Sequence, residues 1–333
     1  MTAPAPATGT TRVAVVGAGA IGRGWAALAA VHGWPVTILD TDAHATDAAM
    51  LEIADRVHSL VLLGRAEQAV AEAGLAQLKA GRSLLQACGD ADWIIESVTE
   101  DLALKQRLFE NFEGIAKPEA IISSSSSGLP MTDIGSHCRD QKRLVVAHPL
   151  NPPELIPLIE VVPGKFTSHQ TVEAVCALLR ALGRIPIALN REIPGNVVGR
   201  IAAAVYRECA DLVLTDVVDV DQIDRAVSLG PSLGWAAAGP HLTYHLGAGD
   251  GGLGGFMQHL TKTFETLWGN LAKWDHLEPD QVRQLTTLVE KAYGNKLELI
   301  RGARDRRLAT ILKGLESSRR TRGQGPASTA QRE

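Results

Sequence analysis

Short apolar runs alternate with amphipathic stretches along the first half of the chain. The runs are rich in β-branched residues and end at Gly, Asp or Ser, while the stretches between them show helical spacing, as at Leu108, Phe109 and Phe112. The predicted strands are 13–16, 36–39, 93–97, 121–123, 144–147, 159–162 and 186–189. Apolar strands that alternate with helices predict an α/β domain with a parallel sheet covered on both faces.

The pattern changes at Pro194, after which the chain is helical throughout. Residues 195–214 form one long helical pattern, and Asp219 is placed to cap a second helix over 220–228. No strand-like run follows Leu189. We therefore predict an α/β domain over 12–192 and an all-helical domain over 193–315, with disordered tails at 1–11 and 316–333.

Composition and charge exclude several classes of protein. In 333 residues, 45% are hydrophobic and 21% charged, which excludes a disordered chain. A net charge of −4 argues against binding nucleic acid by neutralising phosphates. No apolar run reaches the roughly 18 residues of a membrane span. The N-terminus lacks a secretory pattern and the four cysteines lack CxxC or zinc-type spacing, so we expect a cytoplasmic protein with reduced thiols and no metal.

The first predicted strand runs directly into a GxGxxG motif that a helix follows. The motif consists of Gly17, Ala18, Gly19, Ala20, Ile21 and Gly22. Asp40 ends the second strand, 18 residues after Gly22, where a carboxylate accepts hydrogen bonds from the adenosine ribose. Strand, glycines, helix and acid together predict a doubly wound Rossmann-type sheet that binds a dinucleotide. Because Asp40 repels a 2′-phosphate, the pattern favours NAD over NADP.

A histidine and a glutamate are placed on two neighbouring predicted strands. His148 follows one strand at the carboxyl edge of the sheet, and Glu160 is the second residue of the next. Oxidation of an alcohol by NAD needs a base for the hydroxyl proton, and a carboxylate orients an imidazole that does this work. Composition alone equally allows His148 to be a structural turn residue.

The chain resembles the 3-hydroxyacyl-CoA dehydrogenase family over nearly its whole length. The matching segments are GAGAIGRGWA, ESVTEDLALKQRLF, SSSSSGL, AHPLNPPELIPLIEVVPG and IPG. Within the family it is most similar to the branch that contains L-gulonate 3-dehydrogenase (lambda-crystallin) and L-carnitine dehydrogenase. The resemblance implies a Rossmann domain, a helical domain that forms a homodimer, and a small substrate with a hydroxyl or ketone β to a carboxyl or acyl group.

The resemblance also implies roles for individual residues. His148 matches the general acid/base, Glu160 its carboxylate partner, and Ser127 the serine that hydrogen-bonds the reacting oxygen. Glu100 and Lys105 match positions near the nicotinamide ribose, although local sequence equally suits an exposed charge pair at a helix start. By composition, the other four serines of the run are loop or cap residues.

Two glycines depart from the family pattern. Gly199 stands where relatives usually carry an Asn that touches the substrate oxygen, and Gly234 stands where the hydroxy-acid branch tends to carry an Arg. Asn196, one helical turn before Gly199, either supplies the missing amide or leaves a roomier site. The two glycines also leave volume for a bulky substrate. We expect Asn151, Asn196 and Trp235 to contact it.

Other features of the second half are better explained without a separate site. His241 and His245 are spaced as a metal pair, but no third ligand is evident, so we expect a packed or substrate-facing role. Residues 247–255 are rich in glycine but follow no strand, which predicts a flexible loop and no second nucleotide site.

The sequence therefore predicts an NAD-dependent oxidoreductase that interconverts a β-hydroxy and a β-keto acid or ester. Three alternatives remain: a ketoreductase for a bulky polyketide-type intermediate, a short-chain 3-hydroxyacyl-CoA dehydrogenase, and a non-catalytic NAD-binding protein of the crystallin type. The lost Asn mildly favours the last, whereas the retained His148 and Glu160 argue against it.

Overall fold

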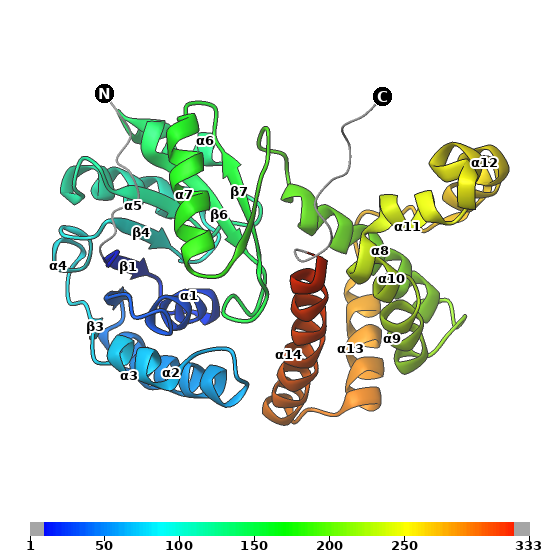
Figure 1. Ribbon diagram of the computed structural model, residues 1–333, viewed down its shortest axis with the longest axis horizontal. Coiled ribbons are helices and arrows are strands. Elements are labelled where there is room, and N and C mark those ends of the chain that lie inside the picture. Colours follow the sequence, from blue (N-terminus) through cyan, green and yellow to red (C-terminus); the bar gives the residue numbers. More distant parts are fainter. Residues whose placement is uncertain (1–9, 323–333) are drawn as a thin grey trace. The chain divides into compact units, whose positions relative to one another are not determined.

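The computed structural model describes residues 10–322, which fall into two compact units with a boundary between Arg200 and Ile201. The first unit holds the strands β1 (Val13–Val16), β2 (Val36–Leu39), β3 (Leu78–Ala80), β4 (Trp93–Glu96), β5 (Ile121–Ser124), β6 (Leu144–Pro149), β7 (Leu158–Pro163) and β8 (Ile185–Ala188). Its helices are α1 (Ala20–Ala30), α2 (Ala43–Leu62), α3 (Gln68–Leu75), α4 (Leu84–Cys88), α5 (Leu102–Ile115), α6 (Met131–Ile134) and α7 (His169–Ala181) (Figure 1).

The strands form one sheet in the order β3-β2-β1-β4-β5-β6-β7-β8. The predicted strands are all present, and the predicted Rossmann-type architecture is confirmed. The prediction of a parallel sheet is wrong for one pair, because β6 and β7 are antiparallel. The connection between them, from Leu150 to Pro157, is too short for a crossover helix, and only a crossover brings two consecutive strands parallel. The sequence prediction missed β3, a three-residue strand at the sheet edge that contains Lys79.

Alternate side chains of the central strands bury one face of the sheet against α5. Ala14, Ile94 and Ile122 pack in one apolar cluster with Phe109 and Phe112, whose rings meet edge to face at a centroid distance of 5.7 Å.

Because β1, β2, β4, β5 and β6 run parallel, their carboxyl ends lie at one edge of the sheet. This edge is where the dinucleotide motif, Asp40 and His148 were predicted to lie.

The second unit is helical. Helix α8 (Asn196–Leu214) crosses the boundary, and α9 (Val220–Leu229), α10 (Pro231–Ala238), α11 (Pro240–Leu246), α12 (Gly252–Asn270), α13 (Pro279–Tyr293) and α14 (Leu297–Arg322) follow it. Ala210, Val213, Val220 and Leu285 form a buried cluster. Asp219 stands at the N-cap position of α9 with an extended backbone, but its side chain makes no capping hydrogen bond, contrary to the prediction.

Two segments are more ordered than their composition suggests. The glycine-rich run forms a 3₁₀ turn over Gly249–Gly251 and then the first turn of α12, so the prediction of a flexible loop is wrong. The helix is held in place because Phe256 and Phe264 pack against the ring of Tyr244. Residues 316–322, predicted as tail, continue α14, and none of these seven residues is Gly or Pro. The remaining predicted tail residues, 1–9 and 323–333, lie outside the described residues.

Within residues 10–322, no helix is both long enough and apolar enough to cross a membrane.

Candidate active site

The glycines of the GxGxxG motif make a turn that leaves room for a ligand. Gly17 has a φ of +108°, and a side chain there would meet the carbonyl oxygen of Ser97 at 2.4 Å. A side chain at Gly22 would meet the Gly17 carbonyl at 1.9 Å, so this glycine lets α1 pack close to β1. Gly19 has nothing within 4 Å of the place where its Cβ would be. The turn therefore fits a pyrophosphate over Gly19, at the start of α1.

Asp40 lies at the end of β2 and joins this strand to the glycine turn. Its Oδ2 accepts a hydrogen bond of 2.7 Å from the backbone N–H of Ala18, and its Oδ1 accepts from Thr41 and Asp42. The backbone N–H of Asp40 in turn donates to Thr46 in α2. These contacts fix the carboxylate beside the turn, in the place predicted for contact with a ribose. Ala20 and Ile21 open α1.

Glu100 and Lys105 do not form the exposed pair that local sequence allowed. Lys105 is buried, and its Nζ lies 2.7 Å from Glu96 Oε1 and 3.4 Å from Glu100 Oε2. Glu96 is itself fully buried and accepts a further bond of 2.6 Å from Ser124. Sequence reasoning missed Glu96, although an acid at the end of the apolar run WIIE needs a buried cation, and Lys105 follows in the next helix.

The Glu100 carboxylate holds the loop after β5. Its Oε1 accepts from the Ser126 hydroxyl and from the backbone N–H groups of Gly128 and Leu129. Burial by itself raises the pKa of Glu100, but the hydrogen bonds from Ser126 and Gly128, with the nearby ammonium, hold that pKa below its ordinary value. Glu100 is therefore ionised at neutral pH.

The serine run is a set of structural contacts with one exception. Ser123 accepts from Trp93, Ser124 donates to Glu96, Ser125 accepts from Trp25 and pairs with Ser97, and Ser126 donates to Glu100. The prediction that these four are loop or cap residues is wrong for Ser123 and Ser124, which belong to β5, whereas Ser125 and Ser126 do lie in the loop after β5. Ser127 is exposed, and its side chain makes no hydrogen bond within the described residues.

His148 and Glu160 meet across the antiparallel pair β6 and β7. They are direct partners in the strand register, and His148 Nδ1 lies 2.8 Å from Glu160 Oε2. The Glu160 side chain is fully buried, while that of His148 is 10% exposed. Two residues 12 apart in sequence are thus brought together by a change of strand direction.

The start of α8 holds the second oxygen of Glu160. Glu160 Oε1 accepts from the backbone N–H groups of Val197 and Val198, at 2.8 and 3.0 Å. Burial alone raises the pKa of Glu160, but the hydrogen bonds from His148 and these amides lower that pKa below its ordinary value. An ionised carboxylate only accepts hydrogen bonds, so His148 Nδ1 donates to Glu160 and Nε2 is the ring nitrogen left for proton exchange with a ligand.

The turn that opens α8 depends on two residues with left-handed backbone. Gly195 has a φ of +75° and Asn196 a φ of +48°. Asn is the side chain that tolerates this conformation best after glycine, and Asn196 is buried here. Gly199, one turn later, has nothing within 4 Å of an added Cβ. Asn196 thus has a backbone role that the sequence did not reveal.

Asn151 is exposed just after β6, and Trp235 lies half-buried on α10 in the second unit; their contact with substrate stays a prediction. His245 accepts from the backbone N–H of Leu253. Tyr244 packs its ring against Phe256 and Phe264.

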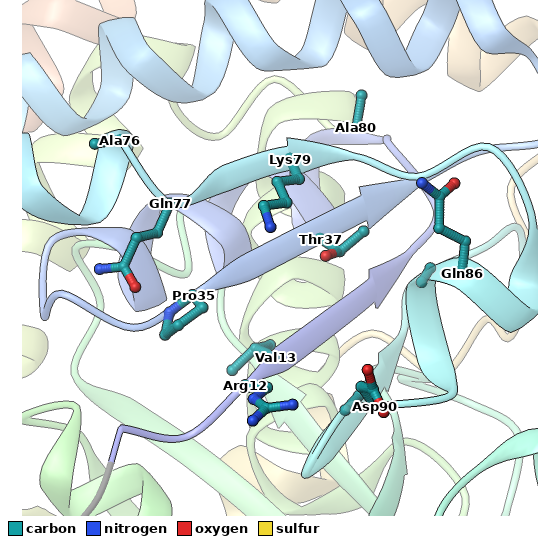
Figure 2. A pocket seen from close by; sticks show the side chains of 12 residues that line it. Arg12, Val13, Pro35, Thr37, Ala76, Gln77, Lys79, Ala80, Gln86 and Asp90 are labelled. Atoms are coloured by element: carbon teal, nitrogen blue, oxygen red, sulfur yellow. The ribbon is translucent and has the colours of Figure 1, made fainter.

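A separate depression of about 590 Å³ lies at the other edge of the sheet. Figure 2 shows Arg12, Pro35, Thr37 and Lys79 around it, at the starts of β1 and β2 and along β3. Because Gly17, Asp40 and His148 lie at the carboxyl ends of their strands, this depression is not part of the site described above.

Comparison with known proteins gives the family. Residues 12–193 match the model of the 3-hydroxyacyl-CoA dehydrogenase NAD-binding domain, and residues 195–286 match that of the C-terminal domain. L-carnitine dehydrogenase of Streptomyces coelicolor is 34% identical over 307 residues, or 91% of this chain and 94% of the relative.

Two solved structures are also similar. One is 5-formyl-3-hydroxy-2-methylpyridine-4-carboxylic acid 5-dehydrogenase, described as an NAD⁺-dependent dismutase, with a TM-score of 0.78, 27% identity and coverage of 92% of this chain and 99% of that one. The other is a diketoreductase that acts on dicarbonyl compounds, with a TM-score of 0.61, 26% identity and coverage of 77% and 93%. The chain is an NAD-dependent oxidoreductase that belongs to the 3-hydroxyacyl-CoA dehydrogenase family.

Proposed function

We propose that the protein interconverts a β-hydroxy and a β-keto carboxylic acid or ester, with His148 and Glu160 as its acid/base pair. The observation that carries the proposal is the 2.8 Å contact between these side chains, on a carboxylate whose other oxygen binds two backbone amides. A carboxylate fixed in this way keeps the imidazole in one orientation and one tautomer.

The residues divide the proton chemistry among them. In the oxidation direction, His148 Nε2 takes the hydroxyl proton of the substrate, and in the reduction direction it returns a proton to the forming alkoxide. Glu160 stabilises the imidazolium form. Ser127, the exposed hydroxyl of the serine run, donates to the reacting oxygen. Bound NAD supplies the acceptor or donor of hydride.

We expect His148→Gln to lower turnover at least 1,000-fold, because glutamine cannot exchange the proton. NADH affinity, measured by fluorescence titration, should change less than about threefold, since no part of the dinucleotide turn is touched. His169→Gln, on an exposed side chain at the start of α7, is the matched control and should be fully active. Turnover retained by His148→Gln would contradict the proposal. Tight NADH binding by the wild-type protein without turnover of any β-keto compound would instead favour a non-catalytic NAD-binding role.

Asp40 is proposed to select NAD against NADP. Its carboxylate is fixed beside the glycine turn and carries a charge that repels a 2′-phosphate. Asp40→Asn should therefore raise kcat/KM for NADPH at least tenfold relative to NADH. Asp42→Asn removes the same charge from the N-cap of α2 two residues away and should leave the ratio unchanged. An equal effect of both variants would show a general field effect, with no selection by Asp40.

A second candidate is reduction of a bulky β-keto compound without CoA. The observation that favours it is the open space at Gly199, where an added Cβ meets nothing within 4 Å, together with Gly234, where the nearest atom is a methyl group of Thr243 at 3.9 Å. The dicarbonyl substrates of the diketoreductase and the pyridine ring in the name of the dehydrogenase point the same way. L-carnitine dehydrogenases, at 34% identity, point to a small acid.

Gly199→Asn separates these two substrate classes. NADH oxidation is measured with acetoacetate, acetoacetyl-CoA, 3-dehydrocarnitine, 3-keto-gulonate and aryl β-keto esters. If the wild-type site is roomy, Gly199→Asn should lower kcat/KM for the aryl esters about tenfold or more and raise it for the small acids. Gly199→Ala, which adds only the Cβ into open space, should fall between them. Turnover of the small acids alone by the wild-type protein would contradict the bulky substrate.

We also propose that the protein is a cytoplasmic homodimer joined through its helical unit. That unit exposes large apolar side chains such as Leu229, Leu246 and Trp268, which a partner subunit would remove from water. The four cysteines of the chain are unpaired, as is usual in a reducing compartment.

Sedimentation velocity tests the dimer. The mass of the wild-type protein obtained from sedimentation should be about twice the 35.4 kDa of one chain. Trp268→Glu should lower this mass toward that of the monomer, because it places a charge among apolar groups of the interface. Leu62→Glu, on an exposed leucine of the first unit, should leave the dimer intact. A monomeric wild-type protein would contradict the assembly.

A further inference from the structure

Five polar residues close a ring of hydrogen bonds and ion pairs where β4 and β5 end, with Lys105 reaching it from α5 and Ser126 using its backbone N–H for one link. In order around the ring they are Glu96, Lys105, Glu100, Ser126 and Ser124. We call this set the Glu96 ring. The Ser126 hydroxyl donates to Glu100, its backbone N–H donates to the Ser124 hydroxyl at 3.1 Å, and the Ser124 hydroxyl donates to Glu96.

The ring reaches Ser126 from two sides. One path leads from Glu96 through the Lys105 ammonium and the Glu100 carboxylate to the Ser126 hydroxyl. The other leads from Glu96 through Ser124 to the Ser126 backbone. The Lys105, Glu96 and Ser124 side chains are buried, so water does not compete for the contacts that Glu96 makes with the other two, whereas Glu100 is 42% exposed.

The residue next to the ring is Ser127. It is exposed and follows Ser126 directly, and the two backbone amides after it, of Gly128 and Leu129, are held by Glu100. The backbone is thus fixed immediately before and after Ser127, while its hydroxyl is left free of any partner within the described residues. A ring built only to stabilise the fold has no need to clamp both sides of one exposed serine.

We propose that Glu96 is a positioning residue that acts through the ring to hold the Ser127 hydroxyl where the reacting oxygen of the substrate binds. This inference rests on the proposed function, because the ring has this role only if Ser127 donates to the reacting oxygen of the substrate. Glu96 touches neither substrate nor cofactor in this role. Lys105 donates to one oxygen of Glu96 and Ser124 to the other, so replacing either oxygen by an NH₂ group removes an acceptor from the ring.

A double-mutant cycle with Ser127 tests the connection. Ser127→Ala should lower kcat about 100-fold through loss of one donor to the developing oxyanion. Glu96→Gln and Ser124→Ala should each lower kcat about tenfold by misplacing that donor. In the Ser127→Ala background the same two changes should lower kcat less than twofold further, since the group that they position is gone. Equal factors in both backgrounds would overturn the proposal.

Ser123→Ala is the matched control. Ser123 is a buried serine of the same run, but it binds Trp93 and the Ile94 carbonyl and stands outside the ring. It should lower stability without changing kcat. If it lowers kcat as much as Ser124→Ala does, the effect is general disruption of β5 and the proposal fails.

Hydrogen exchange provides a readout that needs no turnover. In the protein without cofactor, Ser124→Ala and Glu96→Gln should speed exchange of the amides over 126–129 about tenfold or more, as read by mass spectrometry, and Ser123→Ala should not. If the wild-type protein turns over no β-keto compound, the proposed function fails, and unchanged exchange overturns the ring as well. Faster exchange in that case supports the clamp on the Ser127 loop by itself.

Discussion

The buried charge of Glu160 is the constraint on which the catalytic geometry depends. Removing a carboxylate from water costs several kcal/mol, and the charge survives burial only when its lone pairs are satisfied. Here β7 delivers the carboxylate, β6 delivers the imidazole that satisfies Oε2, and α8 delivers the two amides that satisfy Oε1. Hydrogen bonds to charged groups contribute about 1.5–3 kcal/mol each. Three of them therefore offset the cost and fix the histidine as a consequence.

The same rule governs the opposite side of the site. Glu96 is as deeply buried as Glu160, but its charge is met by an ammonium and a hydroxyl in place of an imidazole and two amides. A backbone N–H from Val98 completes its shell. Each buried acid thus fixes a neighbouring segment, the first turn of α8 for Glu160 and the loop after β4 for Glu96. One presents His148 and the other, in our proposal, presents Ser127.

Much of the fold follows from local patterns. Continuous apolar runs, the glycine motif and Asp40 depend on residues close in sequence, so periodicity and spacing predict the strands and the dinucleotide turn. The antiparallel direction of β7 was missed because it depends on what is absent, namely a crossover helix after His148. The edge strand β3 was missed because an exposed three-residue segment with a lysine has no apolar pattern.

The reacting groups of the site could be predicted from the sequence, but the residues that hold them in place could not. The resemblance gave His148, Glu160 and Ser127, and the register of β6 and β7 agrees with the first two. The role of Glu96 carries no sequence signal of its own. The hydrogen-bond partners of the four consecutive serines carry none either, because the sequence does not distinguish a serine that binds Trp93 or Glu96 from one that binds water. Such contacts are set by the tertiary packing of β4, β5 and α5.

The first turn of α8 contains both the backbone that holds Glu160 and a position, Gly199, whose side chain can change without affecting that contact. The left-handed pair Gly195 and Asn196 turns the chain so that two amides reach Glu160. Any residue except proline at positions 197 and 198 can supply these amides, since only the backbone N–H is used. Gly199 follows one residue later and contributes nothing to this support. A change at Gly199 can therefore alter which substrate fits while the acid/base pair stays in place. This arrangement explains how retained proton chemistry and a departure from the family pattern occur within one turn of helix.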